Sequence, residues 1–161
     1  MSDRGRGYGQ VLAALEAELA AWAGGVDPAK FYDPPEPGAW SVMENLAHAV
    51  EFLRYWADQV HVVVQRPGQP FGRTHDDAER IAWVAEHGKD DPNDVLAALH
   101  QSARYAADRL ADVPDAAWDT ATGIHANRGP MTLPAIVELF LTDHLRAHLH
   151  QAQDAQAGAA R

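Results

Sequence analysis

Apolar residues recur at alternating steps of three and four in four stretches of this chain, and segments containing proline and glycine separate these stretches. Such spacing places the apolar side chains on one face of a helix, so each stretch is predicted to be an amphipathic helix. The segments between them show no convincing strand pattern. The chain is therefore predicted to be all-α, a four-helix bundle with long loops after helices one, two and three, and to form a single domain over residues 1–161.

Local signals predict where the helices begin and end. Gly24-Gly25 would end the first helix, and Ser41 followed three residues later by Glu44 is the capping-box pattern that opens the second. Asp91-Pro92 is a cap followed by proline at the first helical position, which opens the third. The second helix is predicted to run to about residue 65, the fourth over about 133–155, and a short extra helix over 76–86.

Composition excludes several classes of function. The net charge is -10, from 23 acidic and 13 basic residues, which argues against nucleic acid as a partner because phosphate binding needs clustered Lys and Arg. No apolar run is long enough for a membrane span and Met1–Gln10 does not resemble a signal peptide, so we expect a cytoplasmic protein. The chain has no cysteine, so any thiol chemistry must arrive with a small molecule. The scarcity of lysine and abundance of alanine suggest a GC-rich bacterial genome.

The fourth predicted helix carries two histidines on its apolar stripe. His144 and His148 continue the stripe of Val137, Phe140 and Leu141, and residues four apart lie close enough for two imidazoles to share one ion. The alternative interpretation is a chance pair of hydrogen-bonded histidines, since the chain has 9 of them. His150 is predicted to face solvent and to have no role.

Helix two is the expected source of a third ligand, and His48 is the candidate. Periodicity places His48 only at the border between the inward face and the predicted solvent face, so His100 and His125 remain rivals. Glu51, one turn after His48, is a candidate for accepting its second N–H. The predicted solvent face of helix two comprises Glu44, Glu51, Arg54, Asp58 and His61.

Two motifs in this sequence resemble those of the DinB-like family. The stretch Trp40-Ser41-Val42-Met43-Glu44-Asn45-Leu46-Ala47-His48 is similar to its W-S-x-x-E-x-L-x-H signature, and His144, His148 and Gln151 match its H-x-x-x-H-x-x-Q signature. Gly129-Pro130-Met131-Thr132-Leu133 resembles the usual entry to the last helix of that family. The resemblance implies a four-helix bundle that holds a divalent metal on His48, His144 and His148. Where family members often place an acidic residue or a further histidine, this chain has Leu145 and Ala147.

Three neutral imidazoles would leave the metal an open position, which is typical of a catalytic site. Zinc is expected ahead of nickel, iron or copper. The resemblance extends to thiol-dependent S-transferases and maleylpyruvate isomerase-like proteins, and it favours transfer of a low-molecular-weight thiol to an electrophile through a metal-bound thiolate. Mycothiol is expected ahead of bacillithiol or glutathione. The alternatives are a hydrolase using metal hydroxide and a non-catalytic, stress-related binding protein. A homodimer is expected, and the candidates for handling protons are Glu51, Tyr55 and His125.

Overall fold

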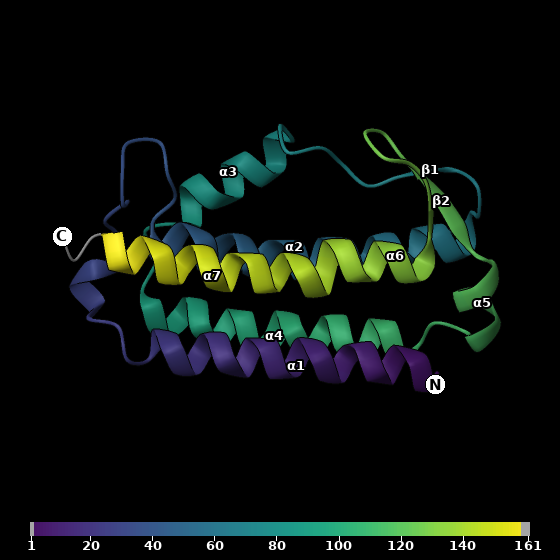
Figure 1. Ribbon diagram of the computed structural model, residues 1–161, viewed down its shortest axis with the longest axis horizontal. Coiled ribbons are helices and arrows are strands. Elements are labelled where there is room, and N and C mark those ends of the chain that lie inside the picture. Colours follow the sequence, from purple (N-terminus) through teal and green to yellow (C-terminus); the bar gives the residue numbers. More distant parts are fainter. Residues whose placement is uncertain (1, 159–161) are drawn as a thin grey trace.

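Four long helices form a bundle in the computed structural model, which describes residues 2–158 (Figure 1). In Figure 1 the first helix and the last helical segment run in one direction, and the second and third long helices run in the opposite direction. The predicted all-α four-helix bundle is confirmed. The long helices are α1 (Asp3–Ala23), α2 (Val42–Gln65), α4 (Pro92–Ala111) and the continuous segment formed by α6 (Leu133–Val137), the turn η2 (Glu138–Thr142) and α7 (Asp143–Gly158).

The predicted capping residues are found at the helix ends. The Ser41 hydroxyl accepts a hydrogen bond from the Glu44 backbone N–H, and the Glu44 carboxylate accepts one from the Ser41 backbone N–H, which completes a capping box at the start of α2. Asp91 caps α4, where Pro92 occupies the first turn. Gly24 is the C-terminal cap of α1. These local contacts fix where α2 begins, and therefore the position of His48 relative to the end of the bundle.

The apolar stripes of the four long helices meet in one core. Fully buried side chains come from each of them, and Phe31 and Trp118, in the connections after the first and third long helices, join the same core. No helix in residues 2–158 is long and apolar enough to cross a membrane. The largest fully buried side chains of the four long helices are Leu12, Leu19, Phe52, Met43, Leu46, Leu53, Leu99, Leu110, Leu133 and Ile136.

The connections contain more structure than the sequence predicted. The segment after α2 includes β1 (Pro70–Phe71) and α3 (Ala78–His87), and the segment after α4 includes α5 (Asp115–Thr120), β2 (Thr122–His125) and β3 (Gly129–Thr132). A short 3-10 turn, η1 (Pro28–Lys30), lies after α1. The prediction that the loops contain no strand was wrong. Strand β1 pairs in parallel with β2, and β2 pairs antiparallel with β3, so each strand depends on a partner elsewhere in the chain.

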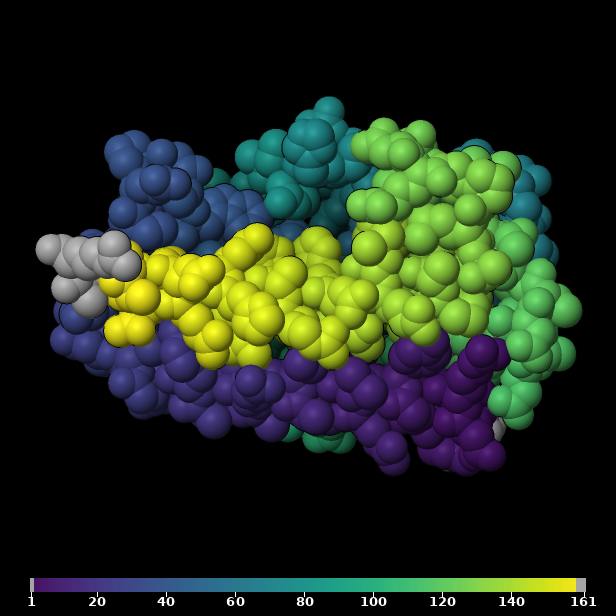
Figure 2. Space-filling view, viewed as in Figure 1, coloured from purple at the N-terminus to yellow at the C-terminus, as the bar shows by residue number. Residues whose placement is uncertain are grey.

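This small sheet lies against α2 and, with α3, covers one side of the bundle. On the face shown in Figure 2 the α3 segment and the β2–β3 segment meet above α7. Gly72 directly follows β1 with a φ of +78°, and a Cβ there would approach the Trp56 ring to 2.8 Å. Only glycine fits this close approach with a positive φ. Gly72 therefore allows the chain to leave β1 in close contact with α2.

The last long helix contains a π-helical turn just before the two candidate ligands. The Asp143 backbone N–H donates to the Glu138 carbonyl five residues earlier, in place of the usual partner four residues earlier. One extra residue in a helical turn shifts the register of the residues that follow, and such turns often accompany functional sites. The apolar stripe on either side of the turn still faces the core, with Val137 before it and Leu145 after it both fully buried.

Candidate metal centre

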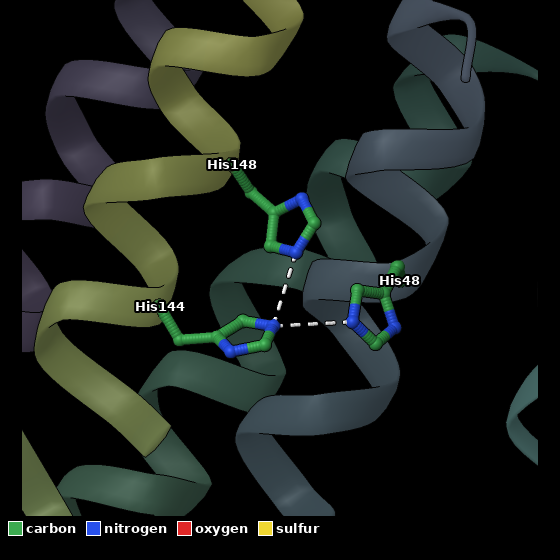
Figure 3. A group of neighbouring side chains, drawn as sticks. All are labelled: His48, His144 and His148. Atoms are coloured by element: carbon green, nitrogen blue, oxygen red, sulfur yellow. Dashed lines mark hydrogen bonds between the residues drawn. The ribbon is translucent and has the colours of Figure 1, made fainter. Parts of the chain in front are cut away.

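Three histidine side chains from two antiparallel helices converge between α2 and α7 (Figure 3). His144 Nε2 lies 3.2 Å from His48 Nε2 and 3.0 Å from His148 Nε2. One ring nitrogen of each histidine lies within 4.8 Å of those of the other two. A tetrahedral ion with metal–nitrogen bonds of about 2.0–2.1 Å places its ligand nitrogens about 3.3 Å apart. Two of the three nitrogen–nitrogen spacings are close to this value and the third is no more than 4.8 Å, so the arrangement is compatible with one shared ion.

Asn45 fixes the orientation of His148. The Asn45 side-chain amide donates to the Ser41 carbonyl at 2.9 Å, which directs its Oδ1 toward His148. His148 Nδ1 lies 2.9 Å from that oxygen and must donate to it. In the neutral ring the proton is then on Nδ1, and Nε2 presents a lone pair to the other two histidines. The sequence prediction missed Asn45, although its position one turn before His48 on the same helix was a signal for it.

Glu51 has the corresponding role at His48. Its Oε2 lies 3.4 Å from His48 Nδ1, within ion-pair distance, and within residues 2–158 neither atom has a closer polar partner that forms a hydrogen bond. The contact is long, but it favours a proton on Nδ1 and leaves His48 Nε2 as a second lone pair. A single N–H on His144 can form a full hydrogen bond with only one of these two lone pairs. A metal ion placed among the three rings would accept one nitrogen lone pair from each histidine. The set of donor atoms therefore fits a divalent metal.

The charge of Glu51 is stabilised in turn by Arg73. The side chain of Glu51 is 13% exposed, its Oε1 contacts Arg73 Nη2, and the Arg73 guanidinium lies 3.9 Å above the centre of the Tyr55 ring. Burial alone would raise the pKa of Glu51, but hydrogen bonding to His48 and Arg73 and the charge of Arg73 hold that pKa below its usual value. The prediction that Glu51 lies on a solvent face was wrong, because the chain after β1 folds back over it.

The three histidines are held in the neutral state that metal binding requires. Burial, followed by the charge of neighbouring histidines and Arg80, lowers the pKa of His144 to about 4 and that of His148 to about 2. The pKa of His48 is also lowered, chiefly by burial, against the opposing hydrogen bond to Glu51. Protons therefore compete weakly for these nitrogens at neutral pH.

His48 is buried more deeply than its border position predicted, with 2% of its surface exposed. Helix α3 and the segment before α2 cover that side of α2. The Trp83 indole N–H donates to the Ala47 carbonyl, and the Trp40 ring lies 5.1 Å from the His48 ring and stacks at 5.8 Å on His148. With Phe52 packed 4.4 Å from the His144 ring centre, these aromatic side chains pack around the three histidines.

The other histidines named by the sequence do not join this cluster. His125 is buried on β2, where its Nε2 donates to the Arg73 carbonyl and its Nδ1 accepts from the Asn127 backbone N–H. His100 lies on α4 beside Glu16, and His150 is exposed. Within residues 2–158, only His48, His144 and His148 form a group of histidine or acidic side chains that could hold a metal.

A cavity of about 470 Å³ lies beside the histidine cluster. His48 and His144 lie in its wall together with Trp56 and Phe140, which stack on each other at 4.0 Å. His125, a candidate for handling protons in the sequence analysis, contributes to the same wall. Tyr55 instead lies beneath Arg73, with its pKa raised by burial to about 12. The polar and charged side chains of the wall are His48, Arg73, Thr74, His75, Arg80, His125, Asn127, Arg128 and His144.

Residues 12–152 match the family model of the DinB superfamily. The chain belongs to the DinB superfamily. The resemblance carried by the two histidine motifs is thereby confirmed, and the helices that carry these motifs in this DinB-superfamily chain are the ones that bring the histidines together.

Two solved structures share the fold of this DinB-superfamily chain. YfiT from Bacillus subtilis, described as a probable metal-dependent hydrolase with an unusual four-helix bundle topology, matches with a TM-score of 0.78 at 17% identity, over 98% of this chain and 89% of that one. A mutant of the mycothiol-dependent maleylpyruvate isomerase matches with a TM-score of 0.63 at 12% identity, over 94% of this chain and 59% of that one. At these identities the similarity establishes the fold. A comparison with curated proteins finds no matching sequence.

Proposed function

We propose that this protein is a divalent-metal-dependent enzyme that transfers a low-molecular-weight thiol to an electrophilic small molecule. The observation that carries the proposal is the set of three neutral imidazoles beside a cavity of about 470 Å³, with no anionic side chain among the ligands. A divalent ion bound there would retain its full charge and an open position, and would supply the Lewis acidity that deprotonates a coordinated thiol at neutral pH.

The lining of the cavity favours a thiol over water as the nucleophile. None of the side chains in the wall is a carboxylate, and both nitrogens of His125 are engaged by the backbone. Outside the histidine cluster, the exposed His75 is therefore the one imidazole of the wall, within residues 2–158, that is free to accept a proton. Activation of water is usually assisted by a side chain that accepts a proton, whereas a metal-coordinated thiol loses its proton outright. The positive charge of Arg73, Arg80 and Arg128 around the cavity would further stabilise a thiolate.

The protein's own residues have three tasks in this proposal. Asn45 and Glu51 hold the rings of His148 and His48 with their Nε2 atoms directed to one point. Arg73 keeps Glu51 ionised, and Trp40 and Phe52 pack against the rings of His148 and His144. The chain contributes no cysteine, so the thiol must be a cosubstrate. We favour mycothiol, because one protein that shares the fold is a mycothiol-dependent isomerase.

Metal-dependent hydrolysis is the second candidate. It is favoured by the fold similarity to YfiT, which is described as a probable metal-dependent hydrolase. Here the same ion would lower the pKa of water toward neutrality. His75, on the exposed loop before α3, and Arg80 or Arg128 would be the nearest polar side chains to a bound ester.

Cobalt substitution separates the two candidates. Titration of the cobalt-loaded protein with mycothiol, bacillithiol or glutathione should produce a sulfur-to-cobalt charge-transfer band with the cognate thiol. The band should be absent in His148→Ala and retained in His150→Ala, because only His148 lies in the cluster. If none of the three thiols alters the spectrum of a fully loaded sample, the transferase proposal fails. Hydrolysis of activated esters by that sample would then support the second candidate.

Turnover is measured with a chlorinated dinitrobenzene as model electrophile. The thiol sulfur forms a bond to the ring carbon, chloride leaves, and the thiol proton passes to the buffer, so the product absorbs as a thioether. The rate should depend on both the thiol and the metal. A protein that binds the thiol but forms no conjugate with this or other electrophiles would fit a non-catalytic binding protein instead.

A further inference from the structure

The cavity beside the three histidines is lined by cations in a protein that is otherwise strongly acidic. Three arginines and no carboxylate contribute to its wall, although the chain has 23 acidic and 13 basic residues. The arginines come from three separate places: Arg73 follows β1, Arg80 lies on α3, and Arg128 lies in the turn between β2 and β3. Surface arginines of an acidic protein usually have carboxylate neighbours, so this arrangement requires a reason.

Arg73 has such neighbours. Its guanidinium contacts Glu51 through Nη2 and lies 3.4 Å from an Asp77 oxygen through Nη1. Only 8% of its side chain is exposed. Its charge is therefore largely compensated within the protein, and its role is to hold Glu51 against His48.

Arg80 is different, because its side chain has no carboxylate within ion-pair distance in the described part of the chain. Its Nη1 donates to the His75 carbonyl at 2.8 Å, and its guanidinium lies 5.0 Å from the centre of the Trp40 ring. Burial, followed by the charge of Arg73, lowers its pKa. A guanidinium stays protonated at neutral pH, so this partly buried cation without a carboxylate partner would gain from a bound anion.

Arg128 is the second arginine without a carboxylate partner. Its guanidinium lies 5.9 Å from the Phe140 ring centre, and the structure of residues 2–158 gives its side chain no hydrogen bond or ion pair. It is exposed on the β2–β3 turn and belongs to the same cavity lining as Arg80. Aromatic faces therefore support both unpaired guanidinium groups, which lowers the entropy that each would lose on binding a ligand.

We propose that this cavity binds a small organic oxyanion, a carboxylate or a phosphate ester, through Arg80 and Arg128, and that the electrophile accepted by the enzyme carries such a group. Guanidinium groups bind both kinds of oxyanion through paired N–H donors. The cavity of about 470 Å³ is large enough for an organic molecule with the oxyanion at one end and its reacting atom near the histidines. The second half of the proposal rests on the proposed function, and the first half does not.

The test is direct binding of small anions to the zinc-loaded protein. Binding is measured by calorimetry and by the change in fluorescence of Trp40 and Trp56. Succinate and glycerol phosphate are the anionic probes, and dimethyl succinate and glycerol are their uncharged counterparts. At least one anionic probe should bind, and its uncharged counterpart should bind tenfold more weakly or not at all. Arg80→Gln and Arg128→Gln should each weaken binding of that probe by about tenfold, because each removes a charge-assisted contact.

Arg104→Gln is the matched control, because Arg104 is exposed on α4 and is not part of the cavity wall. It should bind the probe as the unaltered protein does. Equal helical content and zinc content in all variants would show that Arg80→Gln and Arg128→Gln leave the fold and the metal site intact. The proposal is overturned if neither anion binds, if the uncharged probes bind equally, or if Arg104→Gln weakens binding as much as the cavity variants.

Binding and thiol chemistry give separate readouts. Arginine-dependent binding of an anion, without any effect of thiols on the cobalt spectrum, would support the oxyanion site and reject thiol transfer. A cobalt–thiol band in a protein that binds neither anion would support thiol transfer and reject the oxyanion site.

Discussion

Asn45 Oδ1 lies 2.9 Å from His148 Nδ1 and joins the first turn of α2 to the last helix of the bundle. The Asn45 amide is held by the Ser41 carbonyl, and Ser41 is the residue that caps α2. The helix cap and the orientation of a candidate metal ligand are thus parts of one hydrogen-bonded unit. This unit explains how a ring on α7 is directed by a residue 103 positions earlier in the chain.

Loss of Asn45 should weaken metal binding without removing a ligand. Asn45→Ala should lower the affinity for zinc by about 10- to 100-fold, because His148 loses the acceptor that fixes its tautomer and ring orientation. Competition with a chromophoric chelator measures the change. Asn93→Ala is the control, because Asn93 lies in the first turn of α4 and away from the histidines. An unchanged affinity in Asn45→Ala would show that the hydrogen bond to His148 does not orient a ligand.

Removal of each clustered histidine should reduce the amount of bound metal. His48→Ala, His144→Ala and His148→Ala should each lower the metal affinity at least tenfold, because each removes one of three nitrogens within 4.8 Å of one another. His150→Ala should retain metal, because His150 is exposed on the same helix. Elemental analysis of protein purified without an affinity tag measures the content. Equal metal loss in His150→Ala and His144→Ala would contradict the assigned ligands.

The stability of the metal-free protein should fall as the pH decreases from about 6.5 to 5. The folded-state pKa is about 4 for His144 and about 2 for His148, against a value of 6.5 for an unperturbed histidine, so in this range the unfolded chain binds more protons. Each such histidine contributes up to about 1.4 kcal/mol per pH unit to the free energy of unfolding. Urea unfolding of chelator-treated protein at several pH values measures this slope.

Glutamine at these two positions provides the control for the pH dependence. His144→Gln and His148→Gln remove the titrating groups, and the free energy of unfolding of the double variant should depend less on pH over the same range. A slope that is unchanged in the double variant would assign the pH dependence to other groups. The range lies above the usual pKa of carboxyl groups, so they contribute little to it.

The sequence was sufficient for features that depend on neighbouring residues. The capping box of Ser41 and Glu44, the Asp91-Pro92 start of α4 and the spacing of His144 and His148 each involve residues within one turn of a helix. Helical periodicity then determined which faces meet, and four stripes of this kind have few ways to bury their apolar surface other than a bundle. The short helix predicted over residues 76–86 is found as α3 over Ala78–His87.

The small sheet could not be predicted in this way. Strand β1 contains two residues and pairs with a strand more than fifty positions later. A strand so short has no measurable alternation, and its backbone groups are satisfied only once the tertiary fold supplies a partner. The same holds for the π-helical turn before His144, whose sequence, Glu138–Thr142, contains no glycine or proline to signal it.

What the sequence determined by itself is the bundle, the helix starts and the two histidine motifs, because each follows from contacts within a few residues. The tertiary structure alone decided the environment of these motifs. It buried His48, placed Glu51 between His48 and Arg73, and set Asn45 against His148. It also gathered arginines from three separate segments around one cavity. Burial and charge at a site depend on which distant segments cover it, and helical periodicity describes only one helix at a time.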